Sequence, residues 1–253
     1  MKFTFLGTGT SGGVPSLGCS CAVCRSQDPH DKRWRSAALI ESEHTRVLID
    51  SGPDIRMQLM PFVFKPIDAV LLTHIHYDHV AGIDDLRPFC VFGDIHVYAD
   101  ERTAQGLHTT MPYCFTDHLY PGAPKINLHV IEPYQPLRIN EIELLPIEVM
   151  HGQLPILAYR IGNFAYITDM KTIDRRGLQA LQGVETLVVN ALRWEKEHHS
   201  HMLVDDAIEF SRRVGAKHTY LTHLTHLIGF HDEANKRLPE GFEFAYDGLQ
   251  LTL

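Results

Sequence analysis

The chain has 253 residues, of which 44% are apolar and 21% are charged, and its formal net charge is −8. This length accommodates one or two domains, and the composition excludes a disordered, collagen-like or coiled-coil chain. No apolar run approaches the ~20 residues of a membrane span, and the first residues do not resemble a signal peptide, so a cytoplasmic protein is expected.

Strands and helices alternate irregularly along the chain. In its first half, the pattern predicts a strand over 2–6, a glycine-rich loop over 7–13, a hairpin over 36–41 and 45–50, a helix over 53–60, a strand over 67–73, a helix over 82–92 interrupted by Pro88, a strand over 95–98 and a helix over 101–110. In its second half, it predicts strands over 126–131, 137–139, 142–150, 157–161 and 164–168, a helix over 175–181, a strand over 186–190, a helix over 203–213, a strand over 217–222, a helix over 232–237 and a hairpin over 243–253. No Ser/Pro/Gly-rich linker divides these elements, so we expect a single domain over 1–253.

Histidine is unusually abundant, with 17 residues, and its spacing is informative. His74, His76, Asp78 and His79 follow the predicted strand 67–73 within six positions. Residues two apart in extended chain point to the same side, which applies to His74 and His76. After a turn, Asp78 and His79 can face a neighbouring position, so one segment can supply ligands to two adjacent metal ions. Four other histidines lack such spacing, namely His96, His108, His118 and His129.

This segment is similar to the His-x-His-x-Asp-His motif of the metallo-β-lactamase superfamily, and the resemblance implies an α/β (α+β) fold, a four-layer αββα sandwich. It also implies further ligands, and His151, Asp169 and His223 each follow a predicted strand. The implied first metal site is His74, His76 and His151, the second is Asp78, His79 and His223, and Asp169 bridges them. Imidazole and carboxylate ligands are compatible with two zinc, manganese or iron ions.

Three of the five cysteines, Cys19, Cys21 and Cys24, lie within six residues near the N-terminus. An odd cysteine count without a signal peptide argues against a disulfide framework and favours metal ligation. His226 follows His223 by three residues and can point towards this loop. Three thiolates and one imidazole would make a closed, structural zinc site over residues 19–24 and 226. Buried free thiols and a redox centre are the alternatives.

The glycine-rich start, the cysteine loop and the histidine motif, in this order, resemble PhnP-type cyclic phosphodiesterases. The resemblance implies hydrolysis of a small phosphodiester, such as a ribosyl 1,2-cyclic phosphate or a 2′,3′-cyclic nucleotide. Asp78 and His201 are the implied catalytic residues, and His201 would protonate the leaving alkoxide, in preference to its neighbours His198 and His199. Arg193 is a weak candidate for phosphate binding, and a surface salt bridge is the other interpretation.

Two other classes of function stay open. One is another hydrolase on this fold, such as a thioesterase, a lactonase or an RNA-processing nuclease, because the metal ligands are shared among such activities. The other is a non-catalytic metal-binding protein. The acidic charge disfavours an extended nucleic acid as partner, because binding to long polyanions depends on neutralising phosphates. A homodimer is suggested by the resemblance alone, and Met57–Phe64 is interpreted as core or as a partner surface.

Overall fold

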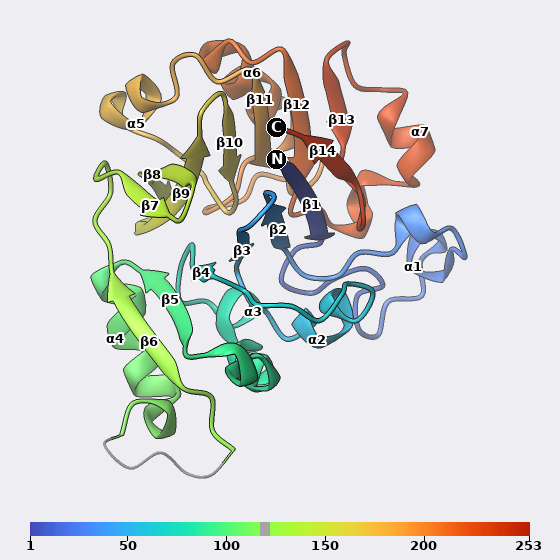
Figure 1. Ribbon diagram of the computed structural model, residues 1–253. Coiled ribbons are helices and arrows are strands. Elements are labelled where there is room, and N and C mark those ends of the chain that lie inside the picture. Colours follow the sequence, from blue (N-terminus) through green and yellow to red (C-terminus); the bar gives the residue numbers. More distant parts are fainter. Residues whose placement is uncertain (117–121) are drawn as a thin grey trace.

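The computed structural model describes residues 1–116 and 122–253, so the predicted non-ligand His118 lies outside the described residues. Two sheets of seven strands each pack face to face, and helices cover the outer side of both (Figure 1). The four-layer αββα sandwich predicted from the resemblance is therefore confirmed.

The first sheet contains the N-terminal strands and one strand from the end of the chain. In spatial order its strands are β14 (Gln250–Thr252), β1 (Lys2–Gly7), β2 (Ala37–Glu41), β3 (Arg46–Ile49), β4 (Ala69–Leu71), β5 (Ile95–Ala99) and β6 (Ile126–Val130). The pairs from β14 to β3 are antiparallel, and those from β3 to β6 are parallel.

The second sheet contains the remaining strands. In spatial order they are β13 (Phe242–Phe244), β12 (His218–Thr222), β11 (Thr186–Asn190), β10 (Phe164–Ile167), β9 (Leu154–Ile161), β8 (Ile142–His151) and β7 (Leu137–Ile139). β10 to β13 run parallel to one another, whereas β9 is antiparallel to both β8 and β10. The C-terminal ends of β8, β10 and β12 therefore lie at the same edge of the sheet.

Helices occupy the two outer layers and the connections. They are α1 (Ala22–Arg25), α2 (Ile55–Leu59), α3 (Tyr77–Val80), α4 (Glu101–Thr110), α5 (Arg175–Ala180), α6 (Val204–Val214) and α7 (His231–Asn235), with 3₁₀ helices at Pro29–Asp31, Ile83–Phe92, Pro112–Cys114 and His226–Ile228. Asp100 caps α4, because its side chain accepts a hydrogen bond from the Thr103 amide. Gly215 ends α6 in a left-handed conformation, with a φ of 83°.

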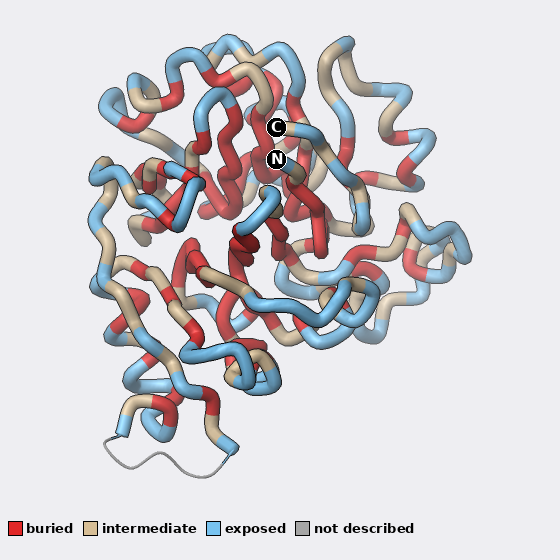
Figure 2. Tube along the Cα trace, in the orientation of Figure 1, coloured by how far each residue is buried: buried red, intermediate tan, exposed pale blue. Residues whose placement is uncertain are grey.

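Apolar side chains fill three layers, which explains why many strands are apolar on both faces. Between the sheets, Phe3 packs against Phe5 and Phe164, with ring centroids 4.9 and 4.8 Å apart. On β2, Ile40 points into this central layer, whereas Leu39 points towards the helices on the outer side. Figure 2 shows the resulting buried strands at the centre of the molecule. Covering both faces of a sheet in this way allows continuous apolar strands.

The structure differs from two sequence predictions about local structure. The C-terminal segment forms no hairpin, because β13 pairs with β12 while β14 pairs with β1 in the other sheet. Asp247 holds the crossing segment in place by accepting hydrogen bonds from the Thr8 amide and hydroxyl and from the Trp34 amide. Residues 83–92 form a 3₁₀ helix with Pro88 inside it, where an interrupted helix was predicted.

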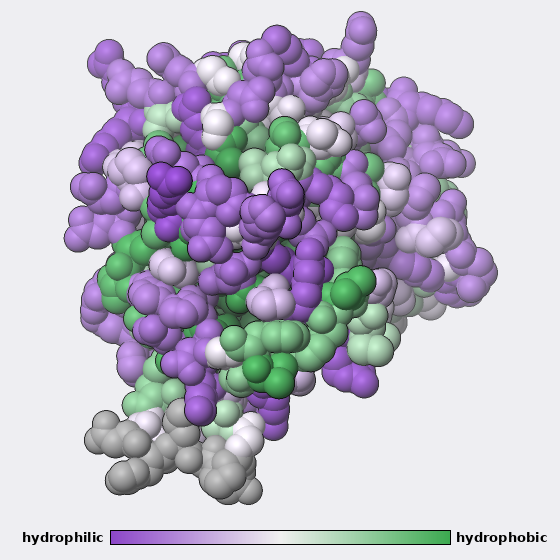
Figure 3. All heavy atoms as spheres, viewed as in Figure 1, coloured by the Kyte–Doolittle hydropathy of each residue, from purple (hydrophilic) through white to green (hydrophobic). Residues whose placement is uncertain are grey.

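The segment between α2 and β4 is partly core and partly surface. Leu59 and Phe62 pack against the outer core, whereas Met57, Met60, Val63 and Phe64 are exposed. Figure 3 shows hydrophobic side chains gathered in the lower middle of this face, over that segment. Among the described residues, no helix combines the length and the apolar character needed to cross a lipid bilayer.

Candidate metal centre and active site

The predicted ligands follow the ends of four strands and lie together at one edge of the sandwich. His74 and His76 follow β4, and Asp78 and His79 lie in the first turn of α3. The other three are His151 at the end of β8, Asp169 two residues after β10 and His223 directly after β12. Asp169 and His223 have positive φ angles of 61° and 57°, which mark sharp turns out of their strands.

Three histidines form the first group. The ligand atoms of His74, His76 and His151 all lie within 4.8 Å of one another. His74 Nε2 lies 3.0 Å from His76 Nδ1, so these two rings converge as the alternation along an extended segment predicts. His151 comes from the other sheet, and its ring centroid lies 5.1 Å from that of His76.

Asp78, His79, Asp169 and His223 form the second group, again within 4.8 Å. His79 Nε2 lies 3.3 Å from an Asp78 oxygen and 3.4 Å from an Asp169 oxygen. His223 Nε2 lies 3.1 Å from the other Asp169 oxygen.

Asp169 also contacts the first group, since its Oδ2 lies 3.7 Å from His74 Nε2. The position of this carboxylate between the two groups agrees with the bridging role implied by the resemblance.

The orientation of the rings suits metal binding. His151 Nδ1 lies 2.7 and 3.0 Å from the carbonyl oxygens of Asp169 and Ser200, so Nδ1 carries the proton and Nε2 is left as a ligand. His79 Nδ1 likewise donates to Asp50 Oδ2 at 2.7 Å. Metal-binding histidines commonly donate their second ring proton to a carbonyl or carboxylate in this way.

Three buried nitrogens in the second group have no hydrogen-bond partner among the described residues, namely His79 Nε2, His223 Nδ1 and His223 Nε2. Unsatisfied buried polar atoms are uncommon in folded proteins and call for a specific explanation. The two Nε2 atoms face carboxylate oxygens, so divalent cations fit this donor set.

The charges of the buried side chains also favour metal binding. Burial opposes ionisation of Asp169, but His223 and His79 outweigh burial and hold the pKa of this carboxyl well below its usual range. Burial likewise disfavours the charged form of His223, yet Asp169 and Asp78 raise its pKa to about 9. The carboxylates thus retain protons on neighbouring imidazoles, and a metal ion can take the place of those protons.

Asp50 is a functional residue that the sequence interpretation missed. This fully buried carboxylate ends the predicted strand 45–50 and has a φ of 61°. It accepts hydrogen bonds from the Thr73 amide and hydroxyl as well as from His79, and so links two loops of the site. A buried aspartate at a strand end was the available signal, but its partner could not be read from the sequence.

His201 lies beside the ligands, as predicted. Its Nε2 lies 3.4 Å from Asp169 Oδ2, and its ring stacks on that of His223 with centroids 4.8 Å apart. Burial lowers its pKa to about 4, with Asp169 acting in the opposite sense. His198 contacts His201 Nδ1 at 3.1 Å, whereas His199 is exposed.

A cavity of about 640 Å³ opens next to the first group of histidines. It is lined by His76, His151, Gly152, Gln153, Leu154, Lys171, Thr172, His199 and Ser200. Arg193, the predicted phosphate-binding candidate, is not among them, and its Nε donates instead to the carbonyl oxygen of Lys196 at 3.0 Å. The structure therefore places Lys171 rather than Arg193 beside the site.

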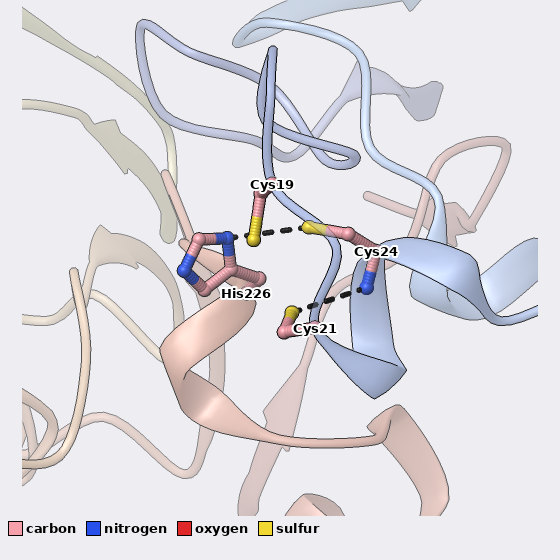
Figure 4. Close-up of side chains that lie close together, drawn as sticks. All are labelled: Cys19, Cys21, Cys24 and His226. Atoms are coloured by element: carbon pink, nitrogen blue, oxygen red, sulfur yellow. Dashed lines mark hydrogen bonds between the residues drawn. The ribbon is translucent and has the colours of Figure 1, made fainter.

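The cysteine loop and His226 form a separate cluster. The ligand atoms of Cys19, Cys21, Cys24 and His226 lie within 4.8 Å of one another, and Cys24 Sγ lies 3.3 Å from His226 Nδ1 (Figure 4). Burial raises the pKa of Cys24 to about 11, whereas a hydrogen bond from the Cys24 amide lowers that of Cys21. All three thiols are free, which agrees with a metal-binding rather than a disulfide role.

Backbone hydrogen bonds carry His226 to the cysteine loop. The Leu224 amide donates to the Thr8 carbonyl oxygen, and the Thr10 amide donates to the Leu224 carbonyl oxygen. These bonds fix the segment 223–226 against the glycine-rich N-terminal loop. As a result, His223 joins the second ligand group while His226 joins the cysteines, as the sequence spacing predicted.

Comparison with known proteins identifies the family. The family model described as "Beta-lactamase superfamily domain" matches residues 45–224. A structure described as a new diphosphatase from the PhnP family is 36% identical, with a TM-score of 0.91, and the match covers 100% of this chain and 97% of the other. Zinc-bound PqqB from Methylobacterium extorquens, at 19% identity and a TM-score of 0.81 over the full length of both chains, shares the fold.

One curated relative is longer than this chain. An octanoyltransferase from Porphyromonas gingivalis is 41% identical over 254 residues, and this chain spans about half of it, 52% of its length. Coenzyme PQQ synthesis protein B from Acinetobacter baumannii is 23% identical over the full length of both chains. From the family match and the likeness to the diphosphatase, the chain belongs to the metallo-β-lactamase superfamily of hydrolases, in which it resembles the PhnP family.

Proposed function

We propose that this protein is a metal-dependent phosphodiesterase that hydrolyses a small phosphodiester, such as a ribosyl 1,2-cyclic phosphate or a 2′,3′-cyclic nucleotide. The observation that carries the proposal is the convergence of seven imidazole and carboxylate ligands beside an open cavity. In this proposal His74, His76 and His151 would hold one divalent ion, Asp78, His79 and His223 would hold a second, and Asp169 would contribute to both.

Two zinc, manganese or iron ions bound there would supply an activated water and neutralise charge on the phosphate. The protein's own residues supply the orientation. Asp50 holds the His79 ring through Nδ1, and two carbonyl oxygens hold the His151 ring in the same manner. Such preorganisation lets the ligands act without rearranging when substrate arrives.

His201 is the residue that we assign to proton donation, through Nε2, the ring nitrogen that faces Asp169. A sugar alkoxide is a poor leaving group unless it receives a proton. The negative charge of a bound phosphodiester would raise the low pKa of His201 and favour the protonated ring. Asp78, the other predicted catalytic residue, would act as a metal ligand.

We further propose that Cys19, Cys21, Cys24 and His226 bind one structural zinc ion. Four protein ligands leave no position open for a substrate, so this site would contribute to folding and not to chemistry. The cluster requires reduced thiols, which supports a cytoplasmic location. The homodimer implied by the resemblance also remains a proposal, for which the exposed apolar segment 57–64 offers a surface.

Diphosphate hydrolysis is the second candidate, because the PhnP-family relative at 36% identity is described as a diphosphatase. Thioester hydrolysis is a third candidate, because the relative that this chain matches over about half of its length is called an octanoyltransferase. A tRNA substrate is disfavoured by the net charge of −8, since long polyanions need a basic surface.

Metal-loaded protein should be assayed with bis(p-nitrophenyl) phosphate, adenosine 2′,3′-cyclic phosphate, a simple diphosphate diester and an octanoyl thioester. We expect turnover of the phosphodiesters, and loss of it after Asp169→Ala. Turnover of the thioester alone would contradict the proposal. Turnover of the diphosphate alone would favour the second candidate.

A further inference from the structure

A second cavity, separate from the metal centre, lies in the outer layer of the first sheet. It has a volume of about 590 Å³ and is formed by residues 55–64, which include α2, and by residues 85–89 of the 3₁₀ helix. Its lining is apolar apart from Arg56, Asp85 and Arg87. None of the seven predicted metal ligands lines this cavity, so it takes no part in the chemistry proposed above.

The apolar lining runs from the core to the surface. Ile55 and Leu86 are buried, whereas Met60 and Phe64 are 66% and 54% exposed. The ring of Phe64 packs on that of Phe89, with centroids 4.9 Å apart, and so forms an aromatic wall. Figure 3 shows that the segment carrying these side chains is a hydrophobic part of the surface. A hollow of this volume, mostly apolar and with few charged groups, has the character of a site for a small ligand.

Arg56 gives this cavity a cation that is free to pair with a ligand. Arg87 is already paired with Asp84, and its Nε also donates to the Asp84 carbonyl oxygen at 3.1 Å. Arg56 forms no ion pair with any residue that the structure describes, and its Nη1 contacts Met57 Sδ, a weak acceptor, at 3.6 Å. The planar guanidinium of an arginine suits a carboxylate. Asp85 is exposed, so water screens its charge.

We propose that this cavity binds a fatty carboxylate, with the alkyl tail against Leu59, Phe64 and Phe89 and the carboxylate paired with Arg56. The combination of an apolar hollow and one unpaired cation matches an amphiphile with an anionic head group. Met60 is unbranched and flexible, so it can adapt to the tail. The inference is independent of the proposed phosphodiesterase function, because the two sites share no residue.

The test measures the binding of octanoate, decanoate and decylammonium to the full chain by calorimetry. Decanoate should bind more tightly than octanoate, by about four-fold for each added methylene that is buried. Decylammonium has the same tail and the opposite charge, and it should bind about 10-fold more weakly than decanoate. Arg56→Gln should remove most of this difference. Arg212→Gln, the matched control at an exposed arginine of α6, should keep the wild-type affinities.

Met60→Asp tests the position of the tail, because it places a carboxylate in the apolar lining at an exposed residue. It should weaken decanoate binding by at least about 10-fold without lowering the melting temperature. If this variant does not fold, Arg56→Gln and the three probes still decide the inference. No binding of decanoate by wild-type protein, or equal affinity for decanoate and decylammonium, would overturn it. Sedimentation velocity tests the other occupant: if Met60→Asp converts a dimer into a monomer and neither binds decanoate, a second copy of the chain covers the cavity and the inference is wrong.

Discussion

His201→Ala is the substitution that tests the proposed mechanism in most detail. The ring is buried, lies 3.4 Å from Asp169 and stacks on His223, so it is held beside the reaction centre. General-acid catalysis contributes about 10²–10⁴-fold, and each factor of ten corresponds to about 1.4 kcal/mol of barrier. We therefore expect about 3–5 kcal/mol of lost transition-state stabilisation for a diester with an alkyl-like leaving group.

The loss should depend on the leaving group. A p-nitrophenolate departs without a proton, so His201→Ala should slow bis(p-nitrophenyl) phosphate much less than adenosine 2′,3′-cyclic phosphate. His218→Ala serves as the control and should leave both rates near wild type, because this exposed histidine lies at the start of β12, at the end opposite to His223. Metal content should be unchanged. An equal loss with both substrates would refute the proton-donor role, and loss of a metal ion would show that His201 is a ligand.

Three further predictions concern stability and metal affinity. Cys21→Ser should lower the melting temperature and the zinc content, because a closed site contributes to folding. The turnover of the folded, metal-loaded fraction should stay near that of wild-type protein. Lost turnover at an unchanged melting temperature would refute the structural role of this cluster. Asp50→Asn should weaken metal binding by about 10–100-fold in chelator competition, since the acceptor of the His79 ring proton loses its negative charge; an unchanged affinity would contradict the positioning role. Burial raises the pKa of Glu41, but Arg46, Lys65 and Lys2 outweigh it and hold this pKa at about 2. The stabilisation by Glu41 is therefore complete above its usual pKa and disappears as the pH falls towards 2, so the melting-temperature deficit of Glu41→Gln should shrink between pH 6 and pH 3.

Most strands could be predicted because apolar runs bounded by turns determine them locally. The resemblance implied His151, Asp169 and His223 as ligands, and the structure brings these residues together because each follows a strand at the edge where the loops meet. The C-terminal segment was mispredicted because Asp247–Gly248 is a good hairpin turn locally. Its strands instead pair with β12 and β1, which are distant in sequence.

The sequence also did not reveal which distant residues contact a given polar side chain. No sequence motif marks Asp50 or Lys171. Only the structure shows that Asp50 contacts His79 and that the backbone of Lys171 is bonded to the end of β8. Arg193 was selected for its guanidinium group, yet its side chain turns back to the carbonyl oxygen of Lys196. A single sequence specifies which residue types follow each strand, but not which of them face the same cavity.

The central claim is that this chain binds two catalytic ions and one structural ion. Metal analysis of purified protein, reconstituted with zinc or manganese and freed of excess ion, tests it most directly. We expect up to three divalent ions per chain in wild-type protein, with the loss of one after substitution of Cys21 and Cys24. One ion or fewer per chain after reconstitution would contradict the account.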